Sequence, residues 1–330
     1  MPANANFDDI VTTTLRNRSG KLADNATKTT ALLDRMRRRG KVKPAGGGRT
    51  IVQELEVSLN TNGGWYAGYD PLNTNPFEPF SAAEYDWKQA YVPIVWSGLE
   101  KLKNMGEFEV IDLVSSRVKN GEKSLYDLVA SSSYSDGTGS GGKQLHGLGL
   151  FVPSDPSTGT VGGISRVSNT FWRNQVVTAT MSAGVNIASV APPAFLRALN
   201  TLAIRCTRGS DRPDLYVADA LGYQTYLECL QPIQRITNEE LGGYGFTNLK
   251  YYGVGSNADF VLDNGYAPAE TVYALNTEFI YLRPHPERNF VPFGGDRIPV
   301  NQDATIRFLG FTGNMCASNL ARQGIMFSTD

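Results

Sequence analysis

The chain has 330 residues, a formal charge of −1 and 41% hydrophobic residues. This length allows one large domain or two ordinary ones, each with a real core. No stretch approaches the roughly 18 apolar residues of a membrane span, and residues 1–9 are small and polar rather than apolar. We therefore expect no secretory segment and no membrane contact, and an intracellular, soluble protein.

Residue types that commonly carry metal or acid–base chemistry are scarce. The three cysteines, Cys206, Cys229 and Cys316, match no zinc or redox spacing. Cys206 and Cys229 fall within predicted helices, so we expect their thiols to be buried. The two histidines, His146 and His285, have no second His, Cys or acid at metal-ligand spacing. The sequence thus predicts no metal, no cofactor and no catalytic residue, and a protein that is not an enzyme.

Positive charge is concentrated near the N-terminus. Residues 1–50 carry eleven Lys or Arg against four Asp, a net +7, which leaves −8 for the remaining 280 residues. Three interpretations stay open: contact with nucleic acid, where neutralised phosphates release counterions, docking on acidic surfaces of a neighbouring subunit, or a solvated tail. The cluster contains no aromatic residues for base stacking, and its members are Arg35, Arg37, Arg38, Arg39, Lys41 and Lys43.

The spacing of apolar residues predicts short helices over 7–16 and 31–39. Helices this short are marginal alone, so we expect them to order only against another surface.

Alternating apolar and polar residues over 51–59 and 84–91 predict two paired strands, separated by about twenty residues rich in turn formers. A two-stranded ribbon is at best marginally stable by itself. Its aromatic face therefore needs a partner, which we expect to be another copy of the chain. The residues assigned to this assembly contact are Ile51, Leu55, Val57, Trp65, Tyr85, Trp87 and Tyr91.

Residues 99–130 repeat apolar side chains every three or four positions, which predicts a long helix that Gly106 or Asn120-Gly121 bends or breaks. The glycine-rich segment that follows has the spacing of a phosphate-binding loop at Gly137, Gly142 and Lys143. Gln144 stands where that motif needs Ser or Thr for magnesium. No buried strand is predicted before the segment and no helix after it. We interpret it as a loop that turns the chain.

After residue 175 the pattern mixes helices and strands. Helices are expected from Pro192 and over 220–230, the latter capped by Asp219. Strands are expected at 214–217, 249–252, 260–262, 272–274, 279–282, 304–311 and 325–327. Elements before 175 and after 283 are expected to share one sheet, with 190–280 inserted as a second lobe. The fold class is α+β.

Three runs of sequence carry a resemblance to a known family. They are the loop from Asp136 to Leu148, the segment from Gly163 to Asn174, and the late run from Asn314 to Gly324. With the order of elements, they resemble the major capsid protein of tailed bacteriophages, the Hong Kong 97-type fold. The residues with this family-like pattern are Gly137, Gly139, Lys143, Gln144, Arg166, Trp172 and Arg173.

The resemblance implies a structural subunit that assembles into hexamers and pentamers of an icosahedral head around double-stranded DNA. It implies a basic N-terminal arm (1–48), an extension loop lying over a neighbour (49–96), a peripheral domain with a spine helix (97–190), an axial domain (191–282) and returning peripheral strands (283–330). It implies a separate scaffolding protein or none, a portal and a decoration protein as candidate partners, and non-specific contact of the arm with the genome.

Other functions remain as alternatives. An encapsulin-like cellular shell would share the fold but hold cargo. A hydrolase would need acid pairs such as Glu239-Glu240 or Asp211 with Asp214, which we interpret as solvated charges. A tail or fibre protein is disfavoured by the expected helices, since such chains are strand-rich throughout.

Overall fold

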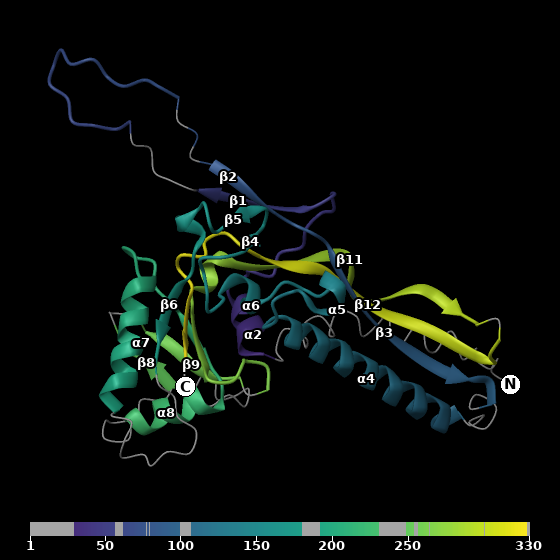
Figure 1. Cartoon of the computed structure of the whole chain (residues 1–330). Coiled ribbons are helices and arrows are strands. Elements are labelled where there is room, and N and C mark those ends of the chain that lie inside the picture. The colour runs from purple at the N-terminus through teal and green to yellow at the C-terminus, as the bar shows by residue number, and fades with distance from the viewer. Residues whose placement is uncertain are drawn as a thin grey trace.

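The structure, a computed structural model, describes residues 30–56, 62–76, 78, 80–99, 107–179, 192–230, 249–253, 257–263, 265–299 and 301–328. Figure 1 shows two parts built around separate sheets, and a thin ribbon that leads away from them into a long loop. The helix expected over 7–16 lies outside the described residues. No described helix is long and apolar enough to cross a membrane.

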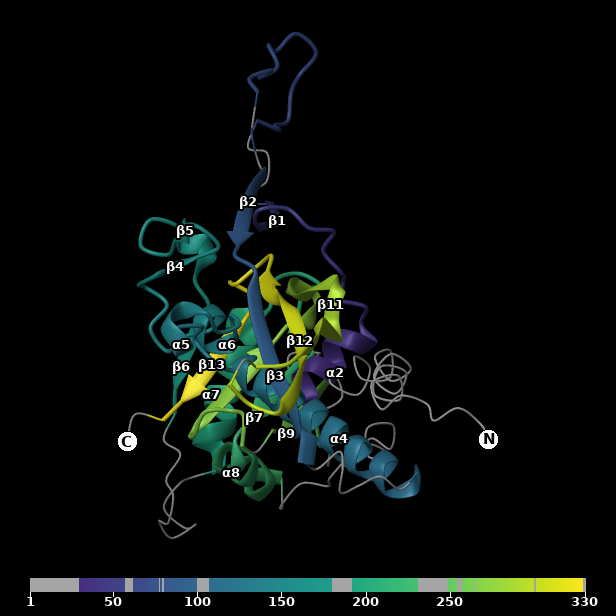
Figure 2. The ribbon, with the colours of Figure 1, turned by 90° about the vertical axis from the view of Figure 1, so that its right-hand side faces the viewer.

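The first part is a three-stranded antiparallel sheet covered by a long helix. Its strands run in the order β11 (Ile280–Arg297), β12 (Ala304–Ala317) and β3 (Lys88–Ser97). Helix α4 (Glu107–Ser132) runs beside β3 (Figure 1), and Figure 2 shows the thin ribbon rising above this sheet. Elements before residue 175 and after 283 thus share a sheet, which confirms that expectation.

The break expected near Asn120-Gly121 is wrong, because α4 continues through it to Ser132. Gly121 instead allows α4 to pack closely against β3. A Cβ at Gly121 would stand 3.1 Å from the side chain of Ile94. Its absence lets the helix approach β3, where Ile94 and Trp96 are buried. The other expected break, Gly106, lies outside the described residues.

The second part is a six-stranded mixed sheet. The order is β6 (Gln175–Thr178), β13 (Gly324–Phe327), β10 (Thr271–Leu275), β7 (Leu215–Ala218), β9 (Ala258–Leu262) and β8 (Leu249–Tyr251). Strands β6 and β13 come from outside the segment 191–282, so this sheet recruits strands from both sides of the inserted lobe. Strands β6 and β13 pair in parallel, and β13, near the C-terminus, joins β6 to β10.

Helices α7 (Pro192–Cys206) and α8 (Ala220–Leu230) cover one face of this sheet and start where the sequence predicts. The expected cap of α8 is confirmed, because Asp219 Oδ1 accepts a 2.8 Å bond from the Gly222 amide. Alternation along β7 divides the protein into two cores. Tyr216 packs with α7 and α8, whereas Leu215 and Val217 face the larger core that continues to the three-stranded sheet.

Helix α2 (Ala31–Arg38) shows how a short helix becomes ordered. Thr30 caps it, with its hydroxyl 3.2 Å from the Leu33 amide. Leu32, Leu33 and Met36 are fully buried against the larger core. Packing against β7 and β11 supplies the stability that eight residues lack alone.

The ribbon is shorter than the sequence suggested. Strand β1 (Ile51–Glu56) pairs antiparallel with β2 (Phe80–Tyr85), with Ile51 opposite Tyr85. Residues 88–91 belong to β3 of the three-stranded sheet instead, because β12 offers them ten residues of pairing. The expected pairing of 51–59 with 84–91 is therefore correct only at its base.

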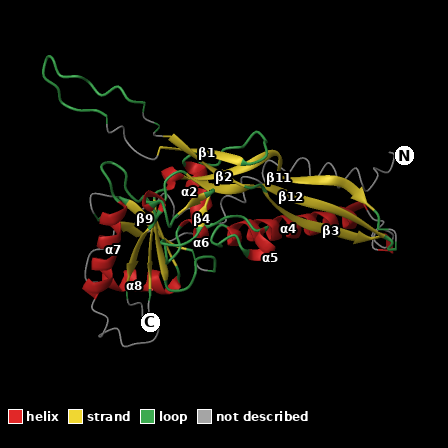
Figure 3. Cartoon of the chain, turned by 45° about the horizontal axis from the view of Figure 1, so that its top comes forward, coloured by secondary structure: helices red, strands yellow, loops and turns green. Residues whose placement is uncertain are grey.

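Short elements join the two parts. They are α5 (Gly139–Gly142), α6 (Leu148–Phe151), β4 (Thr160–Val161), β5 (Ile164–Ser165) and the 3-10 turns Thr170–Trp172 and Thr277–Phe279. Figure 3 shows that loops dominate this junction beside the ribbon base.

Candidate assembly surfaces

The base of the ribbon is buried against its own chain, which corrects the expected assembly contact. Ile51 and Leu55 are at most 4% exposed. The Tyr85 hydroxyl donates to the Ala317 carbonyl at 3.1 Å and accepts from the Ala317 amide at 3.3 Å. Gly162 lies so close that a Cβ there would stand 2.7 Å from Ala83. The partner that the sequence could not locate is thus β12 and the β4–β5 hairpin.

Trp87 also binds its own chain. It is only partly exposed, its indole N–H donates to the Gly48 carbonyl at 2.9 Å, and its ring meets the edge of His285. Val57 lies outside the described residues. Of the expected contact residues, Trp65 and Tyr91 alone are exposed among those described, Trp65 completely.

The loop between β1 and β2 carries the exposed aromatic residues. Trp65 and Tyr69 are fully accessible, and Tyr66 and Leu72 are more than half accessible. The loop has its own turns: Asp70 Oδ2 accepts from the Ala67 amide at 2.9 Å. Across its base, Asn62 Nδ2 donates to the Asn75 carbonyl at 2.8 Å and Asn62 Oδ1 accepts from Asn73. The loop tip, which we define as residues 62–76, therefore presents its aromatic rings to solvent.

The basic cluster contacts acidic groups of its own subunit, an arrangement that none of the three sequence interpretations included. Arg35 forms ion pairs with Asp214 at 3.0 Å and Asp259 at 3.1 Å. Arg39 also reaches Asp214, at 3.3 Å, and Glu278 at 3.8 Å.

Three further cations complete this network. Lys41 Nζ lies 3.1 Å from Glu278, while Arg37 and Arg38 pair with Asp34 on the same helix. The Lys43 amide donates to the Leu282 carbonyl beside β11. Arg35, Arg39 and Lys41 thus hold α2 and the residues after it against carboxylates from other segments of the subunit.

Burial raises the pKa of Asp259, and the Arg35 guanidinium opposes that rise. Asp214, which the sequence offered as half of an acid pair, instead accepts from both the amide and the hydroxyl of Thr277 at 2.7 and 2.8 Å. It is a structural anchor. Glu239-Glu240 lies outside the described residues.

The glycine loop is a tight turn. Ser140 and Gly141 have φ of 54° and 68°, in the left-handed region. Asp136 Oδ1 accepts from the Thr138 amide at 3.0 Å and opens the turn. Gly139 lies close to Gln144, since a Cβ there would meet the Gln144 side-chain oxygen. Lys143 is exposed, and the geometry offers no strand-to-helix phosphate cradle.

The remaining family-like residues brace the junction. Arg166 is 2% exposed and donates to the Leu150 and Phe151 carbonyls at 2.8 and 2.7 Å. Burial lowers its pKa to about 10. Trp172 donates to the Val161 carbonyl at 3.0 Å, and Arg173 to the Arg166 carbonyl at 2.7 Å. Their polar groups satisfy buried carbonyls that loop structure leaves open.

The expected buried thiols are confirmed. Burial raises the pKa of Cys206 and Cys316 to about 12 and that of Cys229 to about 11, so all three are unreactive near neutral pH. Burial, with Lys88 nearby, lowers the pKa of His146 to about 4. In the described part of the chain, no group of three His, Cys, Asp or Glu could hold a metal ion.

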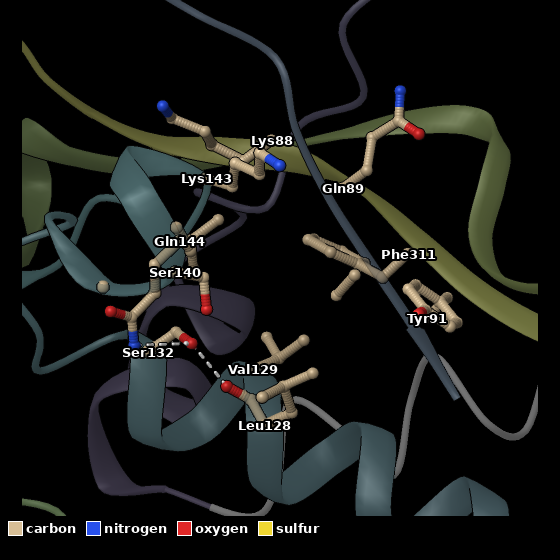
Figure 4. A pocket seen from close by; sticks show the side chains of 13 residues that line it. Lys88, Gln89, Tyr91, Leu128, Val129, Ser132, Ser140, Lys143, Gln144 and Phe311 are labelled. Carbon is tan, nitrogen blue, oxygen red and sulfur yellow. Dashed lines mark hydrogen bonds between the residues drawn. The ribbon is translucent and has the colours of Figure 1, made fainter. Parts of the chain in front are cut away.

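A groove lies between β3, α4 and the glycine loop, with a volume of about 520 Å³. Figure 4 shows Lys88 and Lys143 on one side, Leu128 and Val129 on the other, and Tyr91 and Phe311 along the wall. Of these residues, the sequence singled out Tyr91 and Lys143 for other reasons and predicted no groove. Its walls come from segments separated by up to about two hundred residues, and no local pattern indicates that proximity.

No family model matches the chain, and no curated protein matches it. Solved structures do. The chain is similar to the capsid of Cyanophage A-1(L), with a TM-score of 0.61 and 16% identity over 87% of this chain and 90% of that one. It is similar to the capsid of a native GTA particle, with a TM-score of 0.54 and 7% identity over 88% and 89%.

A third similarity is to an encapsulin from Synechococcus elongatus, with a TM-score of 0.50 and 10% identity over 89% of this chain and 86% of that one. At such identities a likeness establishes the fold alone. The chain has the mixed helix and sheet fold of these capsid proteins, and its expected resemblance to tailed-phage capsid proteins is confirmed.

Proposed function

We propose that the chain is a structural subunit of a tailed-phage head of the Hong Kong 97 type. It assembles into hexamers and pentamers of an icosahedral shell that encloses double-stranded DNA. Its fold, shared with capsid proteins over nearly nine-tenths of the chain, supports this function. The observation that carries it is the loop tip, an ordered segment whose aromatic rings have no cover within the described subunit.

The expected roles of the segments follow the same proposal. Residues 97–190, with α4 as the spine helix, and 283–330 form the peripheral domain. Residues 191–282 form most of an axial domain at the capsomer centre. Residues 49–96 reach over a neighbour, and the arm 1–48 lies on the inner face near the genome. A portal and a decoration protein complete the virion, and assembly in the host cytoplasm uses a separate scaffolding protein or none.

Many copies must contribute weak contacts to such a shell. Permanent interfaces between subunits bury about 2,000–5,000 Å², and repeated head-to-tail contacts close into rings when the rotation permits. The exposed Trp65 and Tyr69 can each bury about 150–250 Å² against a neighbour. They are therefore a substantial share of one such interface.

The test replaces residues 62–76 by a short Gly-Ser turn. This deletion spares the strand pairing of β1 with β2 and the hydroxyl of Tyr85, which the fold uses. The variant should keep its circular dichroism spectrum and unfold normally but form no shells by negative-stain electron microscopy. Wild-type protein that stays monomeric by sedimentation at every concentration, with or without scaffold, would contradict the proposal.

A second candidate is an encapsulin-like cellular shell, favoured by the likeness to the Synechococcus elongatus encapsulin. The two functions differ in content. Particles from the native source should hold nuclease-protected DNA if the chain builds a phage head. Particles of one small size that hold a co-purified enzyme and no DNA would favour the cellular shell.

A further inference from the structure

The groove between β3, α4 and the glycine loop combines open apolar surface with positive charge. Leu128 is 42% exposed and Tyr91 61% exposed, so apolar surface remains open to solvent there. Phe311 forms part of the wall. Among the groove's described lining residues there are two lysines and no carboxylate.

The two lysines differ in how they are held. Lys88 Nζ donates to the Gly142 carbonyl at 2.5 Å, which fixes it beside the glycine loop while leaving further N–H donors. Lys143 is exposed at the end of the same loop. The left-handed backbone at Ser140 and Gly141 turns the chain so that this lysine stands opposite Leu128 (Figure 4). The groove thus has an apolar floor and a cationic rim.

The loop tip has the complementary composition. It places Trp65, Tyr66 and Tyr69 beside Asp70, and its described residues include no lysine or arginine. Asp70 is held in the turn by the Ala67 amide, so the carboxylate and the Tyr69 ring are presented together. Figure 1 shows the ribbon carrying this tip away from its own α4 and β3, so the tip leaves its own groove open.

From this complementarity we infer that the groove is the receptor for the loop tip of a second copy of this chain. An aromatic ring of the tip packs against Tyr91, Leu128 and Phe311, and Asp70 pairs with Lys143. A volume of about 520 Å³ accommodates one or two such rings. This inference rests on the proposed function and specifies the partner site for the exposed loop tip.

A disulfide test uses Trp65→Cys combined with Leu128→Cys. The three native cysteines are buried and free, so an unmodified chain supplies no competing thiol. Assembled protein of the double variant, oxidised gently, should run as covalent multimers on a non-reducing gel. The matched control is Trp65→Cys with Tyr252→Cys, because Tyr252 is exposed to a similar degree and follows β8 of the six-stranded sheet. The control should stay monomeric on the gel.

A charge-exchange test checks the ion pair. Asp70→Lys and Lys143→Glu should each reduce the yield of shells about tenfold, and the combined variant should recover most of it. Exchange of charge at Lys123, an exposed residue of α4 outside the groove, is the control for a general effect of surface charge. It should leave the yield unchanged and should fail to rescue Asp70→Lys.

The outcomes separate the docking site from the shell. Shells that form without a Trp65–Leu128 cross-link and without charge rescue would overturn the inference while leaving the proposed function standing. Cross-linked multimers without closed particles would support the docking site but contradict the proposed shell function. Monomeric protein without any cross-link would overturn both.

Discussion

At the scale of single residues, Arg166 shows how a buried cation can donate hydrogen bonds to backbone carbonyls instead of pairing with carboxylates. Its guanidinium spans the Leu150 and Phe151 carbonyls at the end of α6, inside the junction between the two sheets. The sequence singled out this arginine only through a family-like pattern. Its role depends on carbonyls that a loop leaves unpaired, and residue spacing does not reveal them.

We expect Arg166→Met to lower the free energy of unfolding by about 2–4 kcal/mol, because two buried carbonyls lose their donors. Urea denaturation at pH 7 measures the change. Arg197→Met is the matched control, since Arg197 is exposed on α7, and it should change stability by less than about 0.5 kcal/mol. Equal losses in the two variants would contradict the role of Arg166.

Asp263 joins three elements. Its carboxylate accepts the Tyr134 hydroxyl at 2.5 Å from the end of α4, and the Ala31 amide at the start of α2. In a second hydrogen bond the carboxylate belongs to α4: the Tyr266 hydroxyl donates to Asp127 at 2.8 Å. Burial raises the pKa of Asp263 from 3.8 to about 6.

The raised pKa predicts a specific pH dependence. Protonated Asp263 contributes stability that is fully present below about pH 3.8 and is lost as the pH rises through about 6. Relative to Asp263→Asn, the native protein should therefore lose about 2 kcal/mol of unfolding free energy between pH 4 and pH 7. Denaturation across this range tests it, with Asp127→Asn as the control for the other Tyr–Asp bond. A constant difference between Asp263→Asn and native protein would contradict it.

At the scale of elements, α2 is held by charge as well as by apolar packing. Arg35 bridges Asp214 and Asp259 from two strands of the six-stranded sheet. The sequence located the basic cluster and the short helix correctly. Its three interpretations of the charges, contact with nucleic acid, with a neighbouring subunit or with solvent, did not include carboxylates of the same subunit. Asp214 lies 179 residues from Arg35 in the chain and Asp259 lies still farther, so only folding brings them beside α2.

We expect Arg35→Met to loosen α2 by about 1–3 kcal/mol, because two partly buried carboxylates lose a counterion. Hydrogen exchange at the Met36 amide measures this local opening, which should also speed up with salt in the native protein. The control is Arg49→Met, an exposed arginine just before β1, which should leave exchange unchanged. Loss of protection in both variants would point to a general effect of charge.

The strands show where local pattern succeeds and where it misleads. Alternation located β1 and the β2–β3 region, and the base of the ribbon pairs as expected. The same alternation runs through β2 into β3, so nothing local marks Asp86 and Trp87 as the point where the chain changes sheets. Competition for β12 decides that point, because ten residues of β3 pair with it.

At the scale of the whole molecule, the two cores share one sheet. Cys316 lies in the larger core, and Cys206 and Cys229 lie in the core beneath α7 and α8. Each strand between them has side chains on both faces, so opening one core uncovers the other. We therefore expect the subunit to unfold as one cooperative unit.

Thiol labelling tests this cooperativity. At pH 8 the native protein should resist a maleimide at all three cysteines, whose pKa values are raised to about 11 or 12. In increasing urea, brief labelling followed by mass spectrometry should give the same midpoint for Cys316 and Cys229. An earlier midpoint for Cys229 would show that the lobe beneath α7 and α8 unfolds independently.

The sequence by itself determined the α+β class, the main helices and strands, the buried thiols and the resemblance to capsid proteins, because these depend on local spacing and on composition. Only the tertiary structure decided that Tyr85 and Arg35 serve their own subunit while Trp65 remains uncovered. It also created the groove at Lys143 and Leu128. A side chain's partner depends on which distant segments fold beside it, and hydrophobic periodicity records that a face is buried but not what buries it.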